Sequence, residues 1–239
     1  MPWRLLRKGR IPLRFALVPT AALVALTPLA PAATISSLFN TGVDATGTPL
    51  ADDAPDSHWA LVAPGAQVGA PLVVTAANGF PVPPWIGDNT TSAWIGTLST
   101  SALGPTNVTR EYHYQTTFDL TGFVPSTAII SGQASQDNVL LDVLINGVSA
   151  GISESAVSFG GFSPFSFDAG DIAQLNGGLN TLTFIVQSAT VNGTEDYTSV
   201  RVEFLSREAT LIPEPATAGF LGLAALTLLR RRRRRLQAV

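Results

Sequence analysis

The sequence predicts an all-β domain built as a β-sandwich, flanked by an N-terminal signal peptide and a single C-terminal membrane helix. Short segments between residues 34 and 211 alternate apolar and polar side chains, which is the period of a half-buried strand. Glycine, proline and asparagine separate these segments, and no helical period of any length lies between them. Both ends of the chain instead carry apolar runs beside clusters of basic residues. Residues 34–211 are enough for one domain with its own core.

Residues 1–33 have the three regions of a secretory signal peptide. The first part is basic and contains no acid, and residues 15–29 are apolar, though two prolines interrupt them. Small residues follow in Ala30-Pro31-Ala32-Ala33, so we expect a signal peptidase to cut after Ala32 or Ala33. The alternative is a permanent N-terminal membrane helix, which the two prolines and the small-residue exit disfavour.

The segment from residue 40 to residue 89 is less regular. Short strands are expected at residues 59–62 and 71–75, within long loops rich in aspartate, glycine and proline. Loops of this length in a compact domain are usually functional or held in place by an ion.

The clearest strand covers residues 110–120. Its even positions are mostly aromatic or apolar and its odd positions are polar, so the even positions are expected to face the core. The inward set is Tyr112, Tyr114, Thr116, Phe118 and Leu120, and the outward set is Glu111, His113, Gln115, Thr117 and Asp119.

The second half of the domain is a series of strands joined by turns. Asn146-Gly147 is a strong hairpin signal, because both residue types tolerate a positive φ, and it joins strands at residues 139–145 and 148–152. Further strands are expected at residues 128–134, 164–168 and 179–189, and one helical turn at residues 171–175.

The last strand of the domain is expected at residues 198–205. It alternates, with Val200, Val202 and Phe204 predicted to face inward, and Arg201 and Glu203 outward.

Four groups of residues in these segments stand in a characteristic order: Ser92-Ala93-Trp94-Ile95-Gly96; Phe118-Asp119-Leu120; Ser135-Gln136-Asp137-Asn138 leading into Val143-Leu144-Ile145-Asn146-Gly147; and Gly178-Leu179-Asn180-Thr181-Leu182 followed by Phe184. This order resembles the galactose-binding-like jelly roll, the fold of many carbohydrate-binding modules and of accessory domains in glycosidases. The resemblance covers about residues 38–206 and implies a fold rather than a ligand.

The C-terminal segment, residues 212–235, has three parts. Pro213-Glu214-Pro215 comes first, and its prolines have a fixed φ and no amide donor, so it resists joining a helix or sheet. Residues 216–229 follow without a single charge, in a composition that favours a membrane helix. As a helix this run spans roughly 21 Å, less than the ~30 Å of bilayer hydrocarbon. An arginine cluster, which stays on the cytoplasmic side of a membrane, ends the run: Arg230, Arg231, Arg232, Arg233, Arg234 and Arg235.

These three parts in this order resemble the PEP-CTERM sorting signal of Gram-negative bacteria, and the match covers residues 212–235. The resemblance implies a transient tail anchor that a membrane-embedded cysteine transpeptidase, the exosortase, recognises and removes. The protein would then reach the cell surface or the exopolysaccharide matrix. The implied partners are signal peptidase, exosortase and, transiently, the inner membrane. The alternative is a plain C-terminal tail anchor, in which the residues before the helix would be arbitrary.

The charge of the central domain differs from that of the whole chain. Residues 34–211 carry 16 acidic and 3 basic residues, a net charge of −13, and no lysine. This disfavours nucleic-acid binding, because no basic surface exists to meet phosphate. Cysteine is absent from the chain, which excludes disulfides, thiolate metal sites and cysteine nucleophiles.

Aspartates in the irregular segment suggest a structural calcium site. Ca²⁺ takes about six to eight oxygen ligands from carboxylates, amides and backbone carbonyls. Galactose-binding-like domains often hold calcium in such loops, so the resemblance adds to this prediction. The alternative is that these residues are solvated surface acids. The candidate ligands are Asp44, Asp52, Asp53 and Asp56.

A glycan site is the second candidate, because aromatic rings stack on sugar faces while polar side chains bind hydroxyl groups. Trp85 follows two prolines in a loop expected to be exposed, so it is the preferred platform, whereas Trp59 and Trp94 are expected in the core. The polar candidates are Asp137, Asn138, Arg201 and Glu203.

An enzyme is not predicted. The two histidines are His58 and His113, and a Ser-His-Asp site around His58 and Asp56 lacks a nucleophile elbow. His113 is expected on the polar face of its strand, and the spacing of the carboxylates singles out no acid–base pair.

The sequence thus predicts a secreted, non-catalytic protein that exosortase processes, with a structural or adhesive role in an exopolysaccharide or biofilm matrix. The alternative is a carbohydrate-binding module with a defined glycan site, and a weaker alternative is a secreted hydrolase.

Overall fold

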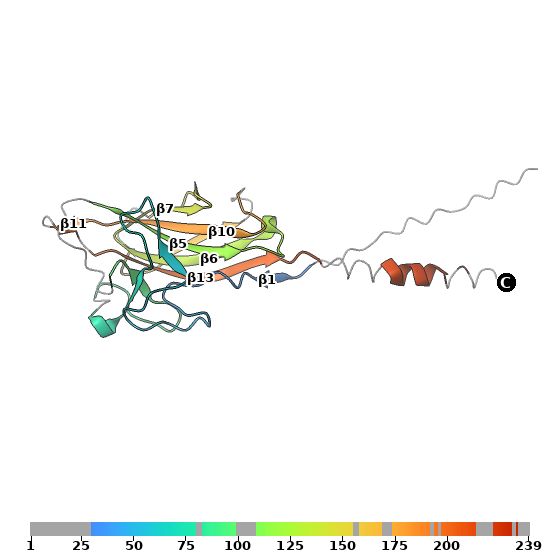
Figure 1. The fold of residues 1–239 in the computed structure, drawn as a ribbon, viewed down its shortest axis with the longest axis horizontal. Coiled ribbons are helices and arrows are strands. Elements are labelled where there is room, and N and C mark those ends of the chain that lie inside the picture. Colours follow the sequence, from blue (N-terminus) through green and yellow to red (C-terminus); the bar gives the residue numbers. More distant parts are fainter. Residues whose placement is uncertain are drawn as a thin grey trace, which may run out of the picture.

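The protein is a β-sandwich of two antiparallel sheets, as its computed structural model shows (Figure 1). The structure describes residues 30–79, 83–98, 109–154, 158–168, 174–191, 194–195, 197–213, 222–230 and 233. Within these residues the regular secondary structure is mostly β-strand, with one short α-helix at residues 222–230. The predicted all-β sandwich is therefore confirmed.

The first sheet has the strand order β3-β4-β13-β6-β9, with β1 also paired to β13. The second sheet has the order β2-β5-β10-β7-β8. The strands of the first sheet are β1 Ala32–Thr34, β3 Leu72–Val74, β4 Trp94–Gly96, β6 Ile129–Asp137, β9 Ser163–Asp168 and β13 Ser199–Thr210. Those of the second are β2 Trp59–Leu61, β5 Glu111–Asp119, β7 Val139–Ile145, β8 Val148–Ser149 and β10 Leu179–Gln187. A small ribbon, β11 Thr190–Val191 with β12 Thr194–Glu195, and two 3₁₀ turns, η1 Ala76–Asn78 and η2 Pro125–Thr127, complete the described elements.

The core lies between the two sheets and follows the alternation in the sequence. The even positions predicted to face inward on β5 are all buried. Phe165 of the first sheet makes edge-on ring contacts with Phe184 of the second at 5.6 Å and with Phe204 at 6.0 Å. Such edge-to-face pairs fill the space between sheets with a preferred ring geometry. Period-two patterning thus placed the core correctly.

The turn at Asn146-Gly147 is the predicted hairpin. Asn146 has φ +50° and Gly147 has φ +81°, the left-handed pair that a tight two-residue turn requires. The Asn146 side chain also accepts a hydrogen bond from the Thr181 N–H at 2.9 Å, which ties the turn to β10. The return strand β8 ends at Ser149, earlier than the predicted residue 152.

Two strands are longer than predicted. β6 continues to Asp137 and β13 continues to Thr210, because the two pair along almost their whole length, with a bulge after Phe204. β1 and β4 were not expected as strands. Most of the helical turn predicted at residues 171–175 lies outside the described residues.

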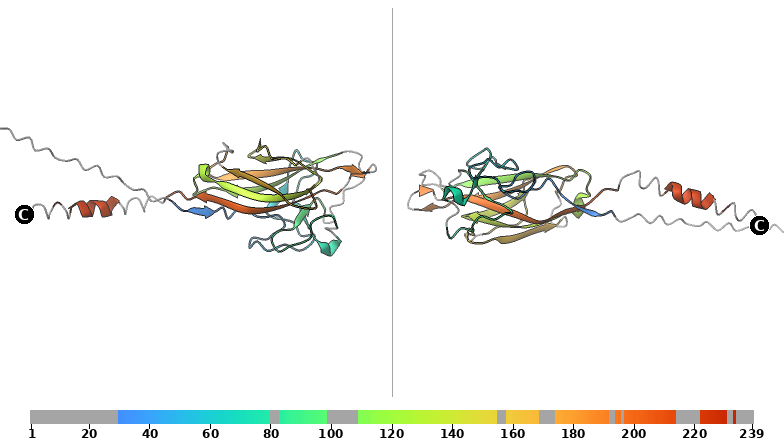
Figure 2. Two further views of the ribbon diagram at one scale, coloured as in Figure 1. Left: turned by 180° about the vertical axis from the view of Figure 1, so that it is seen from behind. Right: turned by 90° about the horizontal axis from the view of Figure 1, so that it is seen from below.

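The N-terminal segment runs along the edge of β13. The Ile35 N–H donates to the Arg207 carbonyl at 2.7 Å, and the Thr41 N–H donates to the Val202 carbonyl at 3.1 Å. β1 pairs with the end of β13 in antiparallel register, Ala32 opposite Thr210. Both ends of the sandwich domain therefore lie side by side at the same end of the molecule (Figures 1 and 2). The sandwich also includes Ala32 and Ala33, which fall inside the range predicted as signal peptide.

Candidate functional site

The predicted sorting signal starts where the sandwich ends. Pro213 is described, whereas Glu214, Pro215 and residues 216–221 lie outside the described residues. Residues 222–230 form an α-helix whose leucines are exposed. Among the residues that the structure describes, no helix is both long and apolar enough to span a membrane. Of the arginine cluster, Arg230 and Arg233 are described and helical, and Arg231, Arg232, Arg234 and Arg235 lie outside.

Backbone hydrogen bonds hold the chain to the sandwich up to the residue before Pro213. The Leu211 N–H donates to the Pro31 carbonyl at 3.1 Å, on the N-terminal side of β1. The Ile212 N–H donates to the Gly122 carbonyl at 2.8 Å, on the opposite side. The residues just before the predicted sorting motif are therefore hydrogen-bonded to the sandwich and are not a free linker.

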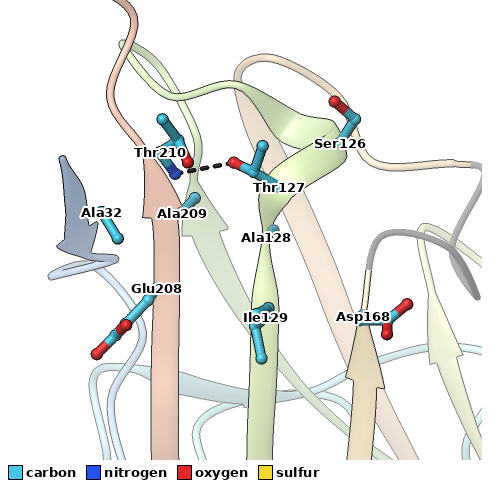
Figure 3. A pocket seen from close by; sticks show the side chains of 9 residues that line it. All are labelled: Ala32, Ser126, Thr127, Ala128, Ile129, Asp168, Glu208, Ala209 and Thr210. Atoms are coloured by element: carbon cyan, nitrogen blue, oxygen red, sulfur yellow. Dashed lines mark hydrogen bonds between the residues drawn. The ribbon is translucent and has the colours of Figure 1, made fainter. Parts of the chain in front are cut away.

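A pocket of about 510 Å³ opens beside this end of the sandwich (Figure 3). Asp168, Ile129 and Glu208 stand in one row across three paired strands, and the Thr210 N–H donates to the Thr127 hydroxyl at 2.8 Å. Small side chains and two carboxylates give the pocket no positive charge for an anionic ligand. Its lining is Ala32, Ser126, Thr127, Ala128, Ile129, Asp168, Glu208, Ala209 and Thr210.

Trp85 is buried, so the prediction that it forms an exposed platform is wrong. Its side chain is only 8% exposed, and its ring lies 4.6 Å from the ring of Trp94. Together with Val74 these two rings form a second apolar cluster, against which Ile86 and Phe159 pack. The reason is that the loop after the prolines folds back onto the domain, where burying a large ring is favourable. Trp59 and Trp94 lie in the interior, as predicted.

Arg201 and Glu203 point away from the main core, as predicted, but they are not exposed. The exposed fractions are 0% for Arg201 and 6% for Glu203. The segment from Gly87 to Ser92 covers this face of the sheet: Arg201 Nε donates to Ser92 Oγ at 2.7 Å and Nη1 donates to the Gly87 carbonyl at 2.8 Å. Arg201 also lies over the ring of Phe162 at 5.5 Å. A buried charge of this kind requires nearby partners.

Glu203 is the acidic partner in this network. Its Oε1 accepts from Asn89 Nδ2 at 2.8 Å and from Ser92 Oγ at 2.7 Å, and its Oε2 accepts from Gln133 Nε2 at 2.7 Å. Arg201 Nη2 lies 3.7 Å from Oε1. Burial acts to raise the pKa of Glu203, but the three hydrogen bonds and the nearby guanidinium outweigh it and lower the pKa below its ordinary value. Burial lowers the pKa of Arg201, which the charge of Glu203 opposes.

Asp137 and Asn138 lie where β6 passes into β7, and both are buried. The Asn138 amide donates to the Asp137 carboxylate, and the Asn138 backbone N–H donates to the Gln187 carbonyl at 3.2 Å. These buried side chains connect strand ends. The structure therefore does not gather the predicted glycan-binding set into one open surface.

Three of the four predicted calcium ligands, Asp44, Asp52 and Asp56, accept hydrogen bonds from different donors. Asp44 Oδ1 accepts from the Thr46 and Thr48 N–H groups at 2.8 and 3.0 Å, and Asp52 Oδ1 accepts from the Thr75 N–H at 2.8 Å. Hydrogen bonds from Thr46 and Thr48 lower the pKa of Asp44.

The other two candidates are also held within the fold. Asp53 has φ +61°, and its N–H donates to the Val73 carbonyl at 2.9 Å. Asp56 is fully buried and accepts from the Gly42 N–H at 2.6 Å. Burial raises the pKa of Asp56. Over the described parts of the chain, no group of three or more His, Cys, Asp or Glu side chains is placed to hold a metal ion.

His58 is not arranged with Asp56 as a catalytic pair. Its Nδ1 lies 3.0 Å from the Val43 carbonyl and 3.9 Å from the Asp56 carboxylate, and its ring stacks on Phe39. Asp56 instead accepts from the His58 backbone N–H at 2.8 Å.

His113 lies on the face of β5 predicted to be polar, but it is buried. The loop at residues 62–66 lies against this part of β5: the Val62 N–H donates to the His113 carbonyl at 3.0 Å, and a Cβ built on Gly65 would lie 3.2 Å from His113 Cδ2.

Two features of these sites were missed from the sequence. Asn89, Ser92 and Gln133 surround the Arg201–Glu203 pair, and the only local signal for them is the turn in which Asn89 Oδ1 accepts from the Ser92 N–H at 2.9 Å. The pairing of Pro31 with Leu211 has no local signal, because it joins opposite ends of the domain.

Comparison of the chain with protein-family models, with curated proteins and with solved structures found no match.

Proposed function

We propose that this chain is the precursor of a secreted, non-catalytic protein that carries a PEP-CTERM sorting signal and that exosortase delivers to the cell surface or matrix of a Gram-negative bacterium. The observation that carries the proposal is the order Pro213-Glu214-Pro215, uncharged residues 216–229 and the arginine cluster. The exposed leucines of the helix at residues 222–230, among them Leu223 at 61% and Leu228 at 66%, support a segment that lies in lipid.

The ectodomain is proposed to be a galactose-binding-like jelly roll. Successive long strands alternate between the two sheets, with β5, β7 and β10 in one and β6, β9 and β13 in the other. This alternation is what a double-sheet jelly roll requires. Such a domain, with a net charge of −13 across residues 34–211, stays soluble among extracellular polymers. This solubility supports the proposed structural or adhesive role in the matrix.

The alternatives have less support. A carbohydrate-binding module needs an accessible aromatic platform, and Trp85, the residue proposed for it, is buried. A hydrolase needs converging catalytic groups, and His58 is engaged by a backbone carbonyl.

Intact-mass measurement of protein extracted from the cell surface tests the proposal. In a host with exosortase, the main species is expected to lack the arginine cluster, and replacement of Pro213, Glu214 and Pro215 by alanine is expected to retain it. The matched control is the same protein in a host without exosortase. A main surface species that keeps Arg230 to Arg235 in the exosortase host would contradict the proposal.

A further inference from the structure

The predicted signal-peptide cleavage site and the strand that leads to the predicted sorting motif are neighbours in the folded sandwich. β1 pairs with the end of β13, with Ala33 opposite Ala209 and Ala32 opposite Thr210. The Leu211 N–H then donates to the Pro31 carbonyl at 3.1 Å. Figure 3 shows Ala32 beside the strand that carries Ala209 and Thr210. The residues around the predicted signal-peptide cut therefore form the edge partner of the residues before the sorting motif.

We propose that removal of the signal peptide releases the flank of the sorting motif, so that the two maturation cuts occur in a fixed order. This inference rests on the proposed function. A cut after Ala32 or after Ala33 removes Pro31 in either case. Hydrolysis adds one water across the peptide bond and leaves a carboxylate on the departing peptide and an amino group on the domain. The Leu211 N–H thereby loses its acceptor.

The position of Leu211 in the sheet changes with this cut. Before it, Leu211 is held through Pro31 on one side and through its bridge to Phe123 on the other. After the signal-peptide cut, the Leu211 N–H at the edge of β13 is unpaired. An enzyme that binds its substrate by backbone pairing can use such an exposed strand edge. The second cut breaks one peptide bond at the motif and passes the acyl group to water or to an amine acceptor.

Other hydrogen bonds still hold the end of β13 after this cut: the Val124 N–H donates to the Thr210 carbonyl at 2.8 Å, and the Thr210 N–H donates to the Thr127 hydroxyl at 2.8 Å. The Ile212 N–H still donates to the Gly122 carbonyl at 2.8 Å, and Pro213 has no N–H to add another bond. Loss of a single backbone hydrogen bond is worth roughly a fivefold change in an opening equilibrium. β1 and the end of β13 lie together at the same end of the sandwich (Figure 2).

Pulse-chase labelling of the full-length chain in a host with exosortase tests this order. The rate at which the C-terminal tail is lost is measured with and without a signal-peptidase inhibitor. We expect the inhibitor to slow tail loss about fivefold. Leu211→Pro removes the N–H that donates to Pro31, so it should restore the rate in the presence of the inhibitor and change little in its absence. Leu211→Ala keeps the N–H and is the matched control, which should remain slow with the inhibitor.

Hydrogen exchange gives a second measurement that needs no variant. In detergent, the Leu211 amide is expected to exchange about fivefold faster in the protein whose signal peptide has been cut than in the full-length precursor. Equal rates of tail loss with and without inhibitor, or an equal effect of Leu211→Pro in both conditions, would overturn the coupling and leave sorting intact. Retention of the tail in every sample would instead overturn the proposed function.

Discussion

The buried carboxylate of Glu203 offers the sharpest test of the structure. Glu203→Gln keeps the shape of the side chain and removes the charge that faces Arg201, whose side chain is 0% exposed. The new amide also brings a donor group toward the donors of Asn89, Ser92 and Gln133. Removal of one partner of a buried ion pair costs about 3–5 kcal/mol. We expect a loss of this size in the free energy of unfolding, measured by urea titration of the 31–213 domain.

Glu208→Gln is the matched control, because Glu208 lies on the same strand and face but is exposed. It should change the free energy of unfolding by no more than about 0.5 kcal/mol. The double variant Arg201→Met with Glu203→Gln should cost less than the sum of the two single variants, since no buried charge is then left alone. Similar losses for Glu203→Gln and Glu208→Gln, or additive single effects, would refute the network.

The pH dependence of the free energy of unfolding tests whether the charge of Glu203 is the cause of this stabilisation. The pKa of Glu203 is lowered in the folded state, so its charge stabilises the fold above its unfolded pKa of about 4.3 and this stabilisation is lost as the pH falls through the folded pKa. The stability difference between wild type and Glu203→Gln should therefore shrink below about pH 4.3. A difference that stays constant down to acid pH would show that the charge is not what matters.

Three further outcomes are expected from purified 31–213 domain. Phe118→Ala, at a fully buried position, should cost about 3–5 kcal/mol, whereas Thr117→Ala on the exposed face should cost less than about 0.5; equal losses in denaturant titrations would mean that the alternation on β5 was misread. Trp85→Ala should lower the melting temperature because it opens a cavity beside Trp94. An unchanged melting temperature together with loss of binding on a glycan array would instead favour Trp85 as an exposed glycan-binding residue. Excess calcium and excess chelator should give the same melting temperature, because Asp44, Asp52 and Asp56 are already held by separate donors; a higher melting temperature in calcium would support the metal site predicted from the sequence.

The sequence by itself determined the class of the fold and the direction of the side chains on its regular strands. The period of two on β5 and β10 is a local property, since each residue's face follows from the pleat of its own strand. The hairpin at Asn146-Gly147 was equally predictable, because the positive φ values that it needs are intrinsic to those residue types. The prediction of a sorting signal also rests only on the order of neighbouring residues.

Only the tertiary structure decided which outward faces are covered. Arg201 and Glu203 point away from the main core as their alternation requires, but a loop more than a hundred residues earlier in the chain, at Gly87 and Ser92, buries them. Trp85 is removed from water in the same way, by contact with Trp94 and Phe159. Burial depends on what a distant segment places over a surface, and a pattern of neighbouring residues carries no information about that segment. The pairing of residues 31–34 with the end of β13 has the same origin, because it joins two segments that are far apart in the sequence and meet only in the folded sheet.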